Sequence, residues 1–325
     1  MSKPKVAFYW CASCGGCEEA VVDLAEDILG VVEAVDIVLW PVALDFKLSD
    51  VEALEDGEIA VSFINGAVRL TEHEEWVKLL RRKSQMVVAF GSCAHLGGIP
   101  GLANAVSRKL IFENKYFRSP TADNPQRVLP RTVSEVDGHE LELPEFLHDA
   151  LPLDEVIEVD YYLPGCAPPP ENILGAVQAI LAGELPPKGS VLAPDKALCE
   201  SCPRNESKPD VVRIEKLRRV AFETPDPEKC FLAEGYVCMG PVTRSGCGER
   251  CIHANMPCRG CFGPTPEAAD QGTKFLSGFA SLFAADDEEK ARELADELVD
   301  PLGTFYRFSL PKSLLRRRAY NGEDE

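Results

Sequence analysis

The chain has 325 residues, 45% of them hydrophobic, and a formal net charge of -19. The negative charge argues against nucleic acid as a partner, because phosphate binding requires clustered Lys and Arg. No run of 18 apolar residues is present, so the sequence predicts no membrane-spanning helix. The first residues, MSKPKVAFYW, turn polar too soon for a signal peptide, and we expect a cytoplasmic protein.

Thirteen cysteines are many for a cytoplasmic chain. In a small secreted protein they would indicate disulfides. Here the count is odd, no export signal is visible, and the chain is long enough to build a core without cross-links. The composition therefore favours reduced, metal-binding cysteines.

The first part of the chain alternates strand-like and helix-like patterns. Short apolar runs predict strands at 5–10, 35–40, 59–64, 86–90 and 156–163. Helical periodicity is present at 17–29 and at 171–181, where Gly183 closes the helix. A third helix is predicted to begin at the capping-box signature of Thr71 and Glu74. Strands that alternate with helices predict βαβ units and a mostly parallel, flavodoxin-like α/β sheet.

Two stretches depart from this alternation. Residues 112–155 are polar and contain several prolines, so we expect an irregular excursion. Residues 186–189, PPKG, indicate a linker. We therefore predict a flavodoxin-like domain over 1–188 and a second domain over 189–325.

The second domain is rich in cysteine and poor in periodicity. Eight cysteines lie within 199–261, among many glycines and prolines, and we expect this segment to bury little apolar surface. Bound metal can supply the missing folding energy. Helical patterns return at 273–284 and in the acidic stretch 286–299, which we interpret as a solvated helix.

Three loops of the first domain carry cysteines directly after predicted strands. Cys14 and Cys17 follow the first strand, Cys93 the fourth and Cys166 the fifth. In an open parallel sheet such loops converge on one edge, where ligands bind. The loops are rich in glycine, which lets backbone approach a cluster closely. The pattern favours a four-thiolate iron–sulfur site; buried structural cysteines are the alternative.

The eight later cysteines suffice for two further four-cysteine sites. They are Cys199, Cys202, Cys230, Cys238, Cys247, Cys251, Cys258 and Cys261. Zinc is the alternative here, because tetrahedral zinc sites also use C-x2-C pairs. Only two such pairs exist, and the gaps between the middle cysteines hold 7, 8 and 3 residues. This irregular spacing favours iron–sulfur clusters.

Several segments together resemble the small, electron-transfer subunit of [NiFe] hydrogenases. The segments are WCASCGGCEEAVVDL, AFGSCAHLGGIPG, LPGCAPPPENI and DPLGTFYRFSLPKSLL. Within that family the chain is most similar to the cytoplasmic F420-non-reducing (methyl-viologen-reducing) type, which works with heterodisulfide reductase. The resemblance covers nearly the whole chain.

The resemblance implies three [4Fe–4S] clusters and assigns twelve cysteines to them. The proximal cluster falls on Cys14, Cys17, Cys93 and Cys166; the medial one on Cys247, Cys251, Cys258 and Cys261; the distal one on Cys199, Cys202, Cys230 and Cys238. Many family members have histidine as the first distal ligand, and this chain has Cys199. Cys251 stands where periplasmic members often carry proline, which implies a four-iron medial cluster.

The implied function is an electron relay within an oxidoreductase complex. Hydrogen would be split in a partner [NiFe] large subunit, so this chain carries no catalytic residue of its own. Electrons would pass through the three clusters to another iron–sulfur or flavin protein, such as a heterodisulfide reductase complex. Two alternatives stay open: the same relay serving a different enzyme, for example a formate dehydrogenase, or a zinc-binding scaffold protein.

Three residues near the proximal motif have open roles. Thirteen cysteines minus three sets of four leave one, and the resemblance makes Cys11 the spare. His95 follows Cys93 by two residues and is either a tuning or subunit-contact residue or a hydrogen-bonded loop histidine. Glu18 follows Cys17 and serves either proton or subunit contacts or the helix dipole.

Overall fold

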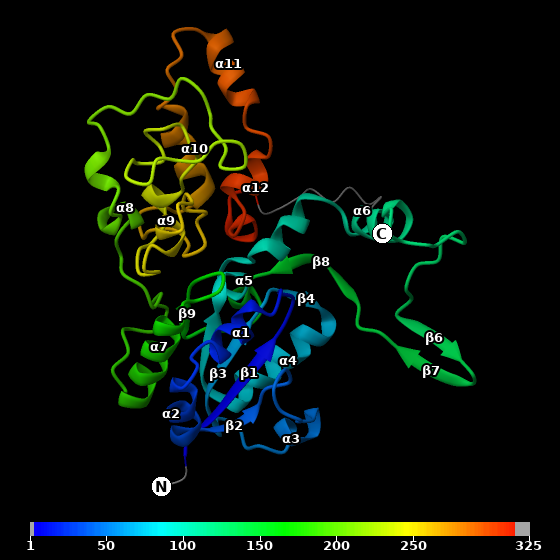
Figure 1. Cartoon of the computed structure of the whole chain (residues 1–325). Helices are drawn as coiled ribbons and strands as arrows, with labels where there is room; N and C mark the ends of the chain where they lie inside the picture. The colour runs from blue at the N-terminus through cyan, green and yellow to red at the C-terminus, as the bar shows by residue number, and fades with distance from the viewer. Residues whose placement is uncertain (1–2, 316–325) are drawn as a thin grey trace.

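A five-stranded parallel sheet forms the centre of the first part of the molecule (Figure 1). The computed structural model describes residues 3–315. The strand order is β2-β1-β3-β5-β9, which is the flavodoxin-like order. The strands are β1 (Lys5–Trp10), β2 (Asp36–Leu39), β3 (Ile59–Asn65), β5 (Ser84–Phe90) and β9 (Tyr161–Leu163). The predicted α/β class and parallel sheet are confirmed.

Helices cover both faces of this sheet. The helices α1 (Gly16–Val22), α2 (Asp27–Ala34) and α7 (Pro170–Ala182) pack on one face; α3 (Leu48–Glu52) and α4 (Thr71–Lys83) pack on the other. Because side chains alternate along a strand, Val6 and Phe8 of β1 join the first core, whereas Ala7 and Tyr9 join the second. All four are buried.

The single helix predicted at 17–29 is wrong, because the chain turns in its middle. α1 ends at Val22 and α2 begins at Asp27, and Ala25 between them has a φ of 51°. The capping box predicted at Thr71 is also wrong. Leu70 is the N-cap residue of α4, and the Thr71 hydroxyl instead accepts the backbone N–H of Glu145 at 3.0 Å.

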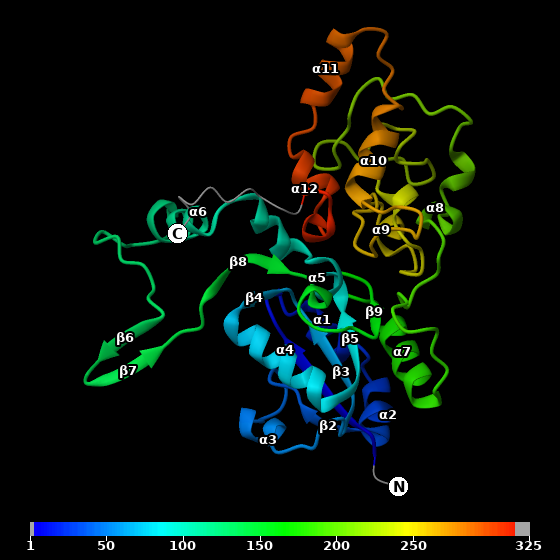
Figure 2. The ribbon, with the colours of Figure 1, turned by 180° about the vertical axis from the view of Figure 1, so that it is seen from behind.

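The excursion predicted as irregular contains regular structure. It holds α6 (Arg108–Glu113), a π-helical turn (Asn114–Arg118), the hairpin β6 (Val133–Val136) and β7 (His139–Glu142), and β8 (Phe146–Leu151). β8 pairs antiparallel with β4 (Val68–Leu70), a strand that the sequence did not predict. The β6–β7 hairpin stands away from the rest of the molecule (Figures 1 and 2).

The strand predicted at 156–163 is shorter than expected. A 3-10 turn (Leu153–Glu155) precedes it, and pairing with β5 begins only at Tyr161. Asp160, one residue earlier, is buried and binds three groups. Its carboxylate accepts the N–H of Val87 at 2.8 Å and pairs with Arg81 at 2.6 Å and with Lys188 at 2.5 Å.

The second part of the chain packs against the carboxyl edge of the sheet (Figures 1 and 2). It contains α8 (Leu198–Ser201), α9 (Arg250–His253), α10 (Gln271–Ala280), α11 (Glu288–Asp296) and α12 (Pro301–Phe305). The expectation of little buried apolar surface is wrong. Aromatic side chains from loops and helices form a core of their own; its buried aromatic members are Phe231, Tyr236, Phe275, Phe279, Phe305 and Tyr306.

The later helices have clear local causes. The Asp270 carboxylate accepts the N–H of Thr273 at 2.9 Å and caps α10. The helix therefore begins at Gln271, two residues before its predicted start. The Asp287 carboxylate caps α11 in the same way by accepting the N–H of Lys290 at 2.8 Å. Within residues 3–315, no helix is long and apolar enough to cross a membrane.

Candidate iron–sulfur sites

The proximal set (Cys14, Cys17, Cys93 and Cys166) lies at the carboxyl edge of the sheet. Cys14 is in the turn after β1 and Cys17 in the first turn of α1. Cys93 belongs to α5 (Gly91–Leu96), which follows β5 directly, and Cys166 is in the loop between β9 and α7. The three loops meet because parallel strands deliver their carboxyl ends to one edge.

The four thiols of the proximal set influence one another electrostatically. Burial is the largest cause of the raised pKa of Cys17. The nearby thiols of Cys93, Cys166 and Cys14 raise that pKa further. Burial also raises the pKa of Cys93 to about 12, with Cys166 and Cys14 adding to the effect. Thiols this close together form a site that favours a cation, since a metal stabilises their thiolate forms.

Two glycines make room for these thiols. A Cβ at Gly91, where φ is +84°, would lie 2.4 Å from the Cys17 Sγ. A Cβ at Gly98, where φ is +57°, would lie 2.4 Å from the Cys93 Sγ. Any larger residue would displace sulfur at both places, so the glycines keep the ligand edge open.

The medial set (Cys247, Cys251, Cys258 and Cys261) lines one small cavity in the second part of the chain. Cys251 lies in α9, and the other three are in loops. Burial raises the pKa of Cys261 to about 12, with contributions from Cys251 and Cys247. Backbone N–H groups at Glu249 and Arg250 counter the pKa rise of Cys247.

The distal set (Cys199, Cys202, Cys230 and Cys238) gathers around Gly240. A Cβ at Gly240 would lie 3.2 Å from the Cys199 Sγ and 3.7 Å from the Cys238 Sγ. Burial raises the pKa of Cys199 to about 12, and the other three thiols of the set add to the rise. Burial also raises the pKa of Cys238 to about 11.

Direct contacts join the three sets in a fixed order. The backbone of Cys166, in the proximal set, hydrogen-bonds to the thiol of Cys261 in the medial set. The backbone N–H of Cys258, in the medial set, donates to the Cys238 Sγ of the distal set at 3.4 Å. Ser92, next to Cys93, also donates its hydroxyl to the Cys261 carbonyl at 2.5 Å. The medial set therefore lies between the other two.

The donor chemistry fits iron–sulfur clusters. Among residues 3–315, no three Cys, His, Asp or Glu side chains are close enough to hold one metal ion together. A [4Fe–4S] cluster needs a wider arrangement, because each of its four thiolates binds a different iron. Groups of four thiols, with glycine beside sulfurs of the proximal and distal sets, are compatible with that need.

Cys11 lies apart from the proximal set. It is 5% exposed and belongs to the core on the α4 face of the sheet, whereas Cys17 belongs to the opposite core. Its backbone N–H donates to the Asn65 carbonyl at 2.8 Å. Burial alone raises the pKa of Cys11, with no contribution from the other cysteines.

Glu18 is a buried carboxyl group beside the proximal set. It accepts hydrogen bonds from the Trp40 indole and the Asn65 amide. Asn65 in turn donates to the Tyr9 carbonyl at 3.2 Å and accepts from the Ser13 hydroxyl at 3.0 Å. Burial raises the pKa of Glu18 in spite of these bonds. No sequence pattern pointed to Trp40 or Asn65 as members of this network, because Trp40 directly follows β2 and Asn65 ends β3.

His95 is an internal residue of the interface between the two parts of the chain. Its ring contacts that of Tyr162 in a tilted arrangement, with centroids 4.6 Å apart, and lies next to Gly263. Burial lowers the pKa of His95 to about 3, so the ring is neutral at physiological pH.

Comparison with protein families identifies relatives along the whole chain. Residues 14–180 match the family of the NADH ubiquinone oxidoreductase 20 Kd subunit. An iron-sulfur subunit of the F420-non-reducing hydrogenase of Archaeoglobus profundus is 42% identical and covers 97% of this chain and 99% of its own. A subunit of the F420-non-reducing hydrogenase of Methanothermobacter thermautotrophicus is 36% identical and covers 96% of each chain.

Solved structures share the fold. A chain of the [NiFeSe] hydrogenase from Desulfovibrio vulgaris Hildenborough superimposes with a TM-score of 0.53 at 17% identity, over 88% of this chain and 99% of its own. The likeness covers both the sheet and the cysteine-rich part.

Proposed function

The chain belongs to the family of F420-non-reducing hydrogenase iron-sulfur subunits and is a subunit of an oxidoreductase complex, and we propose that it relays electrons through three [4Fe–4S] clusters. One observation supports this proposal most: the Cys166 backbone acts on the Cys261 thiol and the Cys258 amide donates to the Cys238 sulfur, as expected if three four-cysteine sites follow one another in a row. When bound, such clusters supply one-electron oxidation and reduction.

The chain's own residues would set the properties of each site. Burial of Cys258 and Cys238, which are 7% and 8% exposed, keeps water from one sulfur of the medial set and one of the distal set. Backbone N–H groups at Gly240 and Cys258 point at the Cys238 sulfur and lower its pKa against the effect of burial. Burial and amide hydrogen bonds are two means by which a protein sets the reduction potential of such clusters.

The family implies a hydrogenase large subunit as the partner. We propose that it docks at the carboxyl edge of the sheet, where Cys14 and Cys166 are exposed. We further propose that the electron acceptor docks near the distal set, and that it is an iron–sulfur or flavin protein such as a heterodisulfide reductase complex. We place the assembly in the cytoplasm, because thirteen free cysteines require a reducing compartment.

Anaerobic purification with the co-expressed partner tests the relay. We expect a brown protein with about twelve irons and equal acid-labile sulfide, and a nickel-containing large subunit that co-purifies. The Cys258→Ser variant should lose about four irons and keep its large subunit. A colourless protein with stoichiometric zinc and no sulfide would refute the relay. Full iron content with a nickel-free catalytic partner would instead assign the relay to another enzyme.

A further inference from the structure

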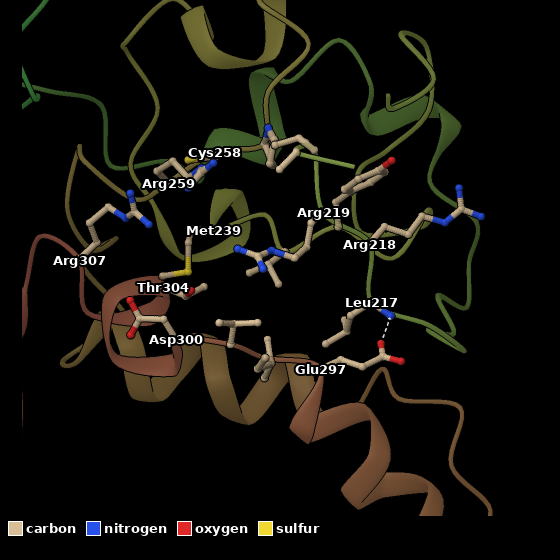
Figure 3. A pocket seen from close by; sticks show the side chains of 17 residues that line it. Leu217, Arg218, Arg219, Met239, Cys258, Arg259, Glu297, Asp300, Thr304 and Arg307 are labelled. Atoms are coloured by element: carbon tan, nitrogen blue, oxygen red, sulfur yellow. Dashed lines mark hydrogen bonds between the residues drawn. The ribbon is translucent and has the colours of Figure 1, made fainter. Parts of the chain in front are cut away.

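A cavity of about 270 Å³ lies in the second part of the chain, beside both the medial and the distal set (Figure 3). Its wall includes Cys258 of the medial set and Met239, the neighbour of Cys238. Segments 217–221, 257–259 and 297–307 form it. Apart from Cys258, no cysteine of the three sets lines this cavity.

Four arginines line the cavity: Arg218, Arg219, Arg259 and Arg307. Only two acidic residues, Glu297 and Asp300, share its wall, which leaves an excess of two positive charges in a chain whose net charge is -19. Both carboxylates accept backbone hydrogen bonds, and the charge of Asp300 partly offsets the positive charge around Arg307. Glu297 accepts the N–H of Leu217 at 2.6 Å, and Asp300 accepts the N–H of Gly303 at 2.8 Å.

Three of the four guanidinium groups have no carboxylate in salt-bridge contact among the described residues. Arg307 donates its Nε–H to the Gly303 carbonyl at 3.0 Å, and Arg219 stacks 5.6 Å from the Phe222 ring. Arg259 faces Arg307, and burial together with this like charge lowers the pKa of Arg307. Arg218 differs, because it pairs with Glu223 at 3.5 Å and points away from the other arginines (Figure 3).

We propose that this cavity binds a small oxyanion of the phosphate class through Arg219, Arg259 and Arg307. A guanidinium group offers paired N–H donors that match the oxygens of phosphate. A bound anion would relieve the repulsion between Arg259 and Arg307. The volume lies just below the range of cofactor-sized pockets, so a small anion fits the cavity better than a large ligand.

The cavity offers a matched pair of variants for the test. Arg307→Gln removes an unpaired charge from the cavity without touching a residue next to a cysteine ligand. Arg218→Gln removes the same charge from the rim, where Glu223 already neutralises it. Arg219→Gln serves as a second variant on the cavity side, in case Arg307→Gln lowers the yield of folded protein. Iron content is measured for each variant to confirm that the cysteine sites are intact.

Calorimetric titration of the anaerobically purified complex with inorganic phosphate gives the readout. We expect saturable binding that weakens at least about tenfold in Arg307→Gln and Arg219→Gln and less than about twofold in Arg218→Gln. A parallel titration with AMP identifies which kind of phosphate the cavity binds. Binding of AMP that is tighter than that of inorganic phosphate indicates an organic phosphate, and weaker binding indicates the free anion. The absence of saturable binding to the complex, or equal weakening in all three variants, would overturn the proposal.

Discussion

Neighbouring cysteines in the segment CASCGGC have different surroundings, and strand geometry is the reason. Cys11 directly follows β1, and its side chain continues the alternation of Ala7 and Tyr9 into the core on the α4 face. Cys14 and Cys17 lie beyond the strand, where Gly15 has a φ of 84° and turns the chain into α1. The turn directs the later two thiols to the sheet edge.

Substitution of these cysteines tests the assignment of the proximal site. Cys11→Ser should keep about twelve irons per chain, whereas Cys14→Ser and Cys17→Ser should fall to about eight, because each removes one of four ligands. Iron and acid-labile sulfide analysis measures the outcome. Cys11→Ala controls for the cost of a buried hydroxyl group at position 11. Equal iron loss in all three serine variants would show that Cys11 is a ligand.

Gly91 provides a second test at the level of one residue. Gly91→Ala would place a Cβ 2.4 Å from the Cys17 Sγ at a φ of +84°, so we expect loss of about four irons. Gly175→Ala is the matched control, because Gly175 is exposed within α7 and a Cβ there meets nothing within 4 Å. The control should keep its iron and gain up to about 1 kcal/mol in unfolding free energy. Normal iron content in Gly91→Ala would contradict the close approach.

The position of each cysteine could be predicted better than its contacts. Loops after parallel strands converge by topology, so the meeting of Cys14, Cys93 and Cys166 follows from the sequence pattern. The contact between the Cys258 amide and the Cys238 sulfur joins residues in irregular loops. No periodicity encodes such a contact, so it could not be foreseen.

At the scale of elements, prediction succeeded where the apolar pattern was unbroken. β1 and β3 agree with their predicted ranges to within one residue because continuous apolar runs mark buried parallel strands. The apolar run at 156–163 predicted too long a strand. Val156 and Val159 pack in the core without strand pairing, and the Asp160 side chain bonds to the Val87 N–H of β5. The β6–β7 hairpin was missed because its strands are short and polar.

Asp160 gives a prediction for the stability of the sheet. Its carboxylate joins α4, β5 and the segment after α7, so Asp160→Asn should lower the unfolding free energy by about 3 kcal/mol. Urea unfolding measures this, followed by tryptophan fluorescence, because all three tryptophans lie within residues 10–76. Asp56→Asn is the control, since Asp56 is 64% exposed and pairs with Lys83 at 3.1 Å; it should lose less than about 1 kcal/mol.

The same residue predicts a pH dependence. Burial alone would raise the pKa of Asp160, but hydrogen bonds from Lys188, Arg81 and Val87 outweigh it and lower the pKa. The stabilisation is therefore present above the unfolded pKa of about 3.9 and is lost as pH falls through the lower folded value. Unfolding curves of the wild-type chain should shift steeply below about pH 4, and those of Asp160→Asn should shift less. Parallel curves for both proteins would contradict this role.

At the scale of the whole molecule, the two parts depend on different sources of stability. The first part has a parallel sheet covered on both faces, and Cys17 is the only proposed cluster ligand in its cores among the described residues. The second part includes Cys238 and Cys258 within its own aromatic core. Its segment 199–261 contains only short helices, and its loops are held by isolated turns and bridges instead of continuous helices or sheets.

Removal of iron should therefore unfold the molecule unevenly. After anaerobic chelation, we expect limited proteolysis to cut first within 199–261, because metal binding supplies the folding energy of these loops. Fragments that contain the sheet should persist, and fluorescence of the three tryptophans should change little. The helices α10 and α12 should be cut later than the loops, since the rings of Phe275, Phe279 and Phe305 pack directly against one another. Mass spectrometry of the fragments locates the cuts, and an unchanged cleavage pattern after iron loss would show that the loops fold without clusters.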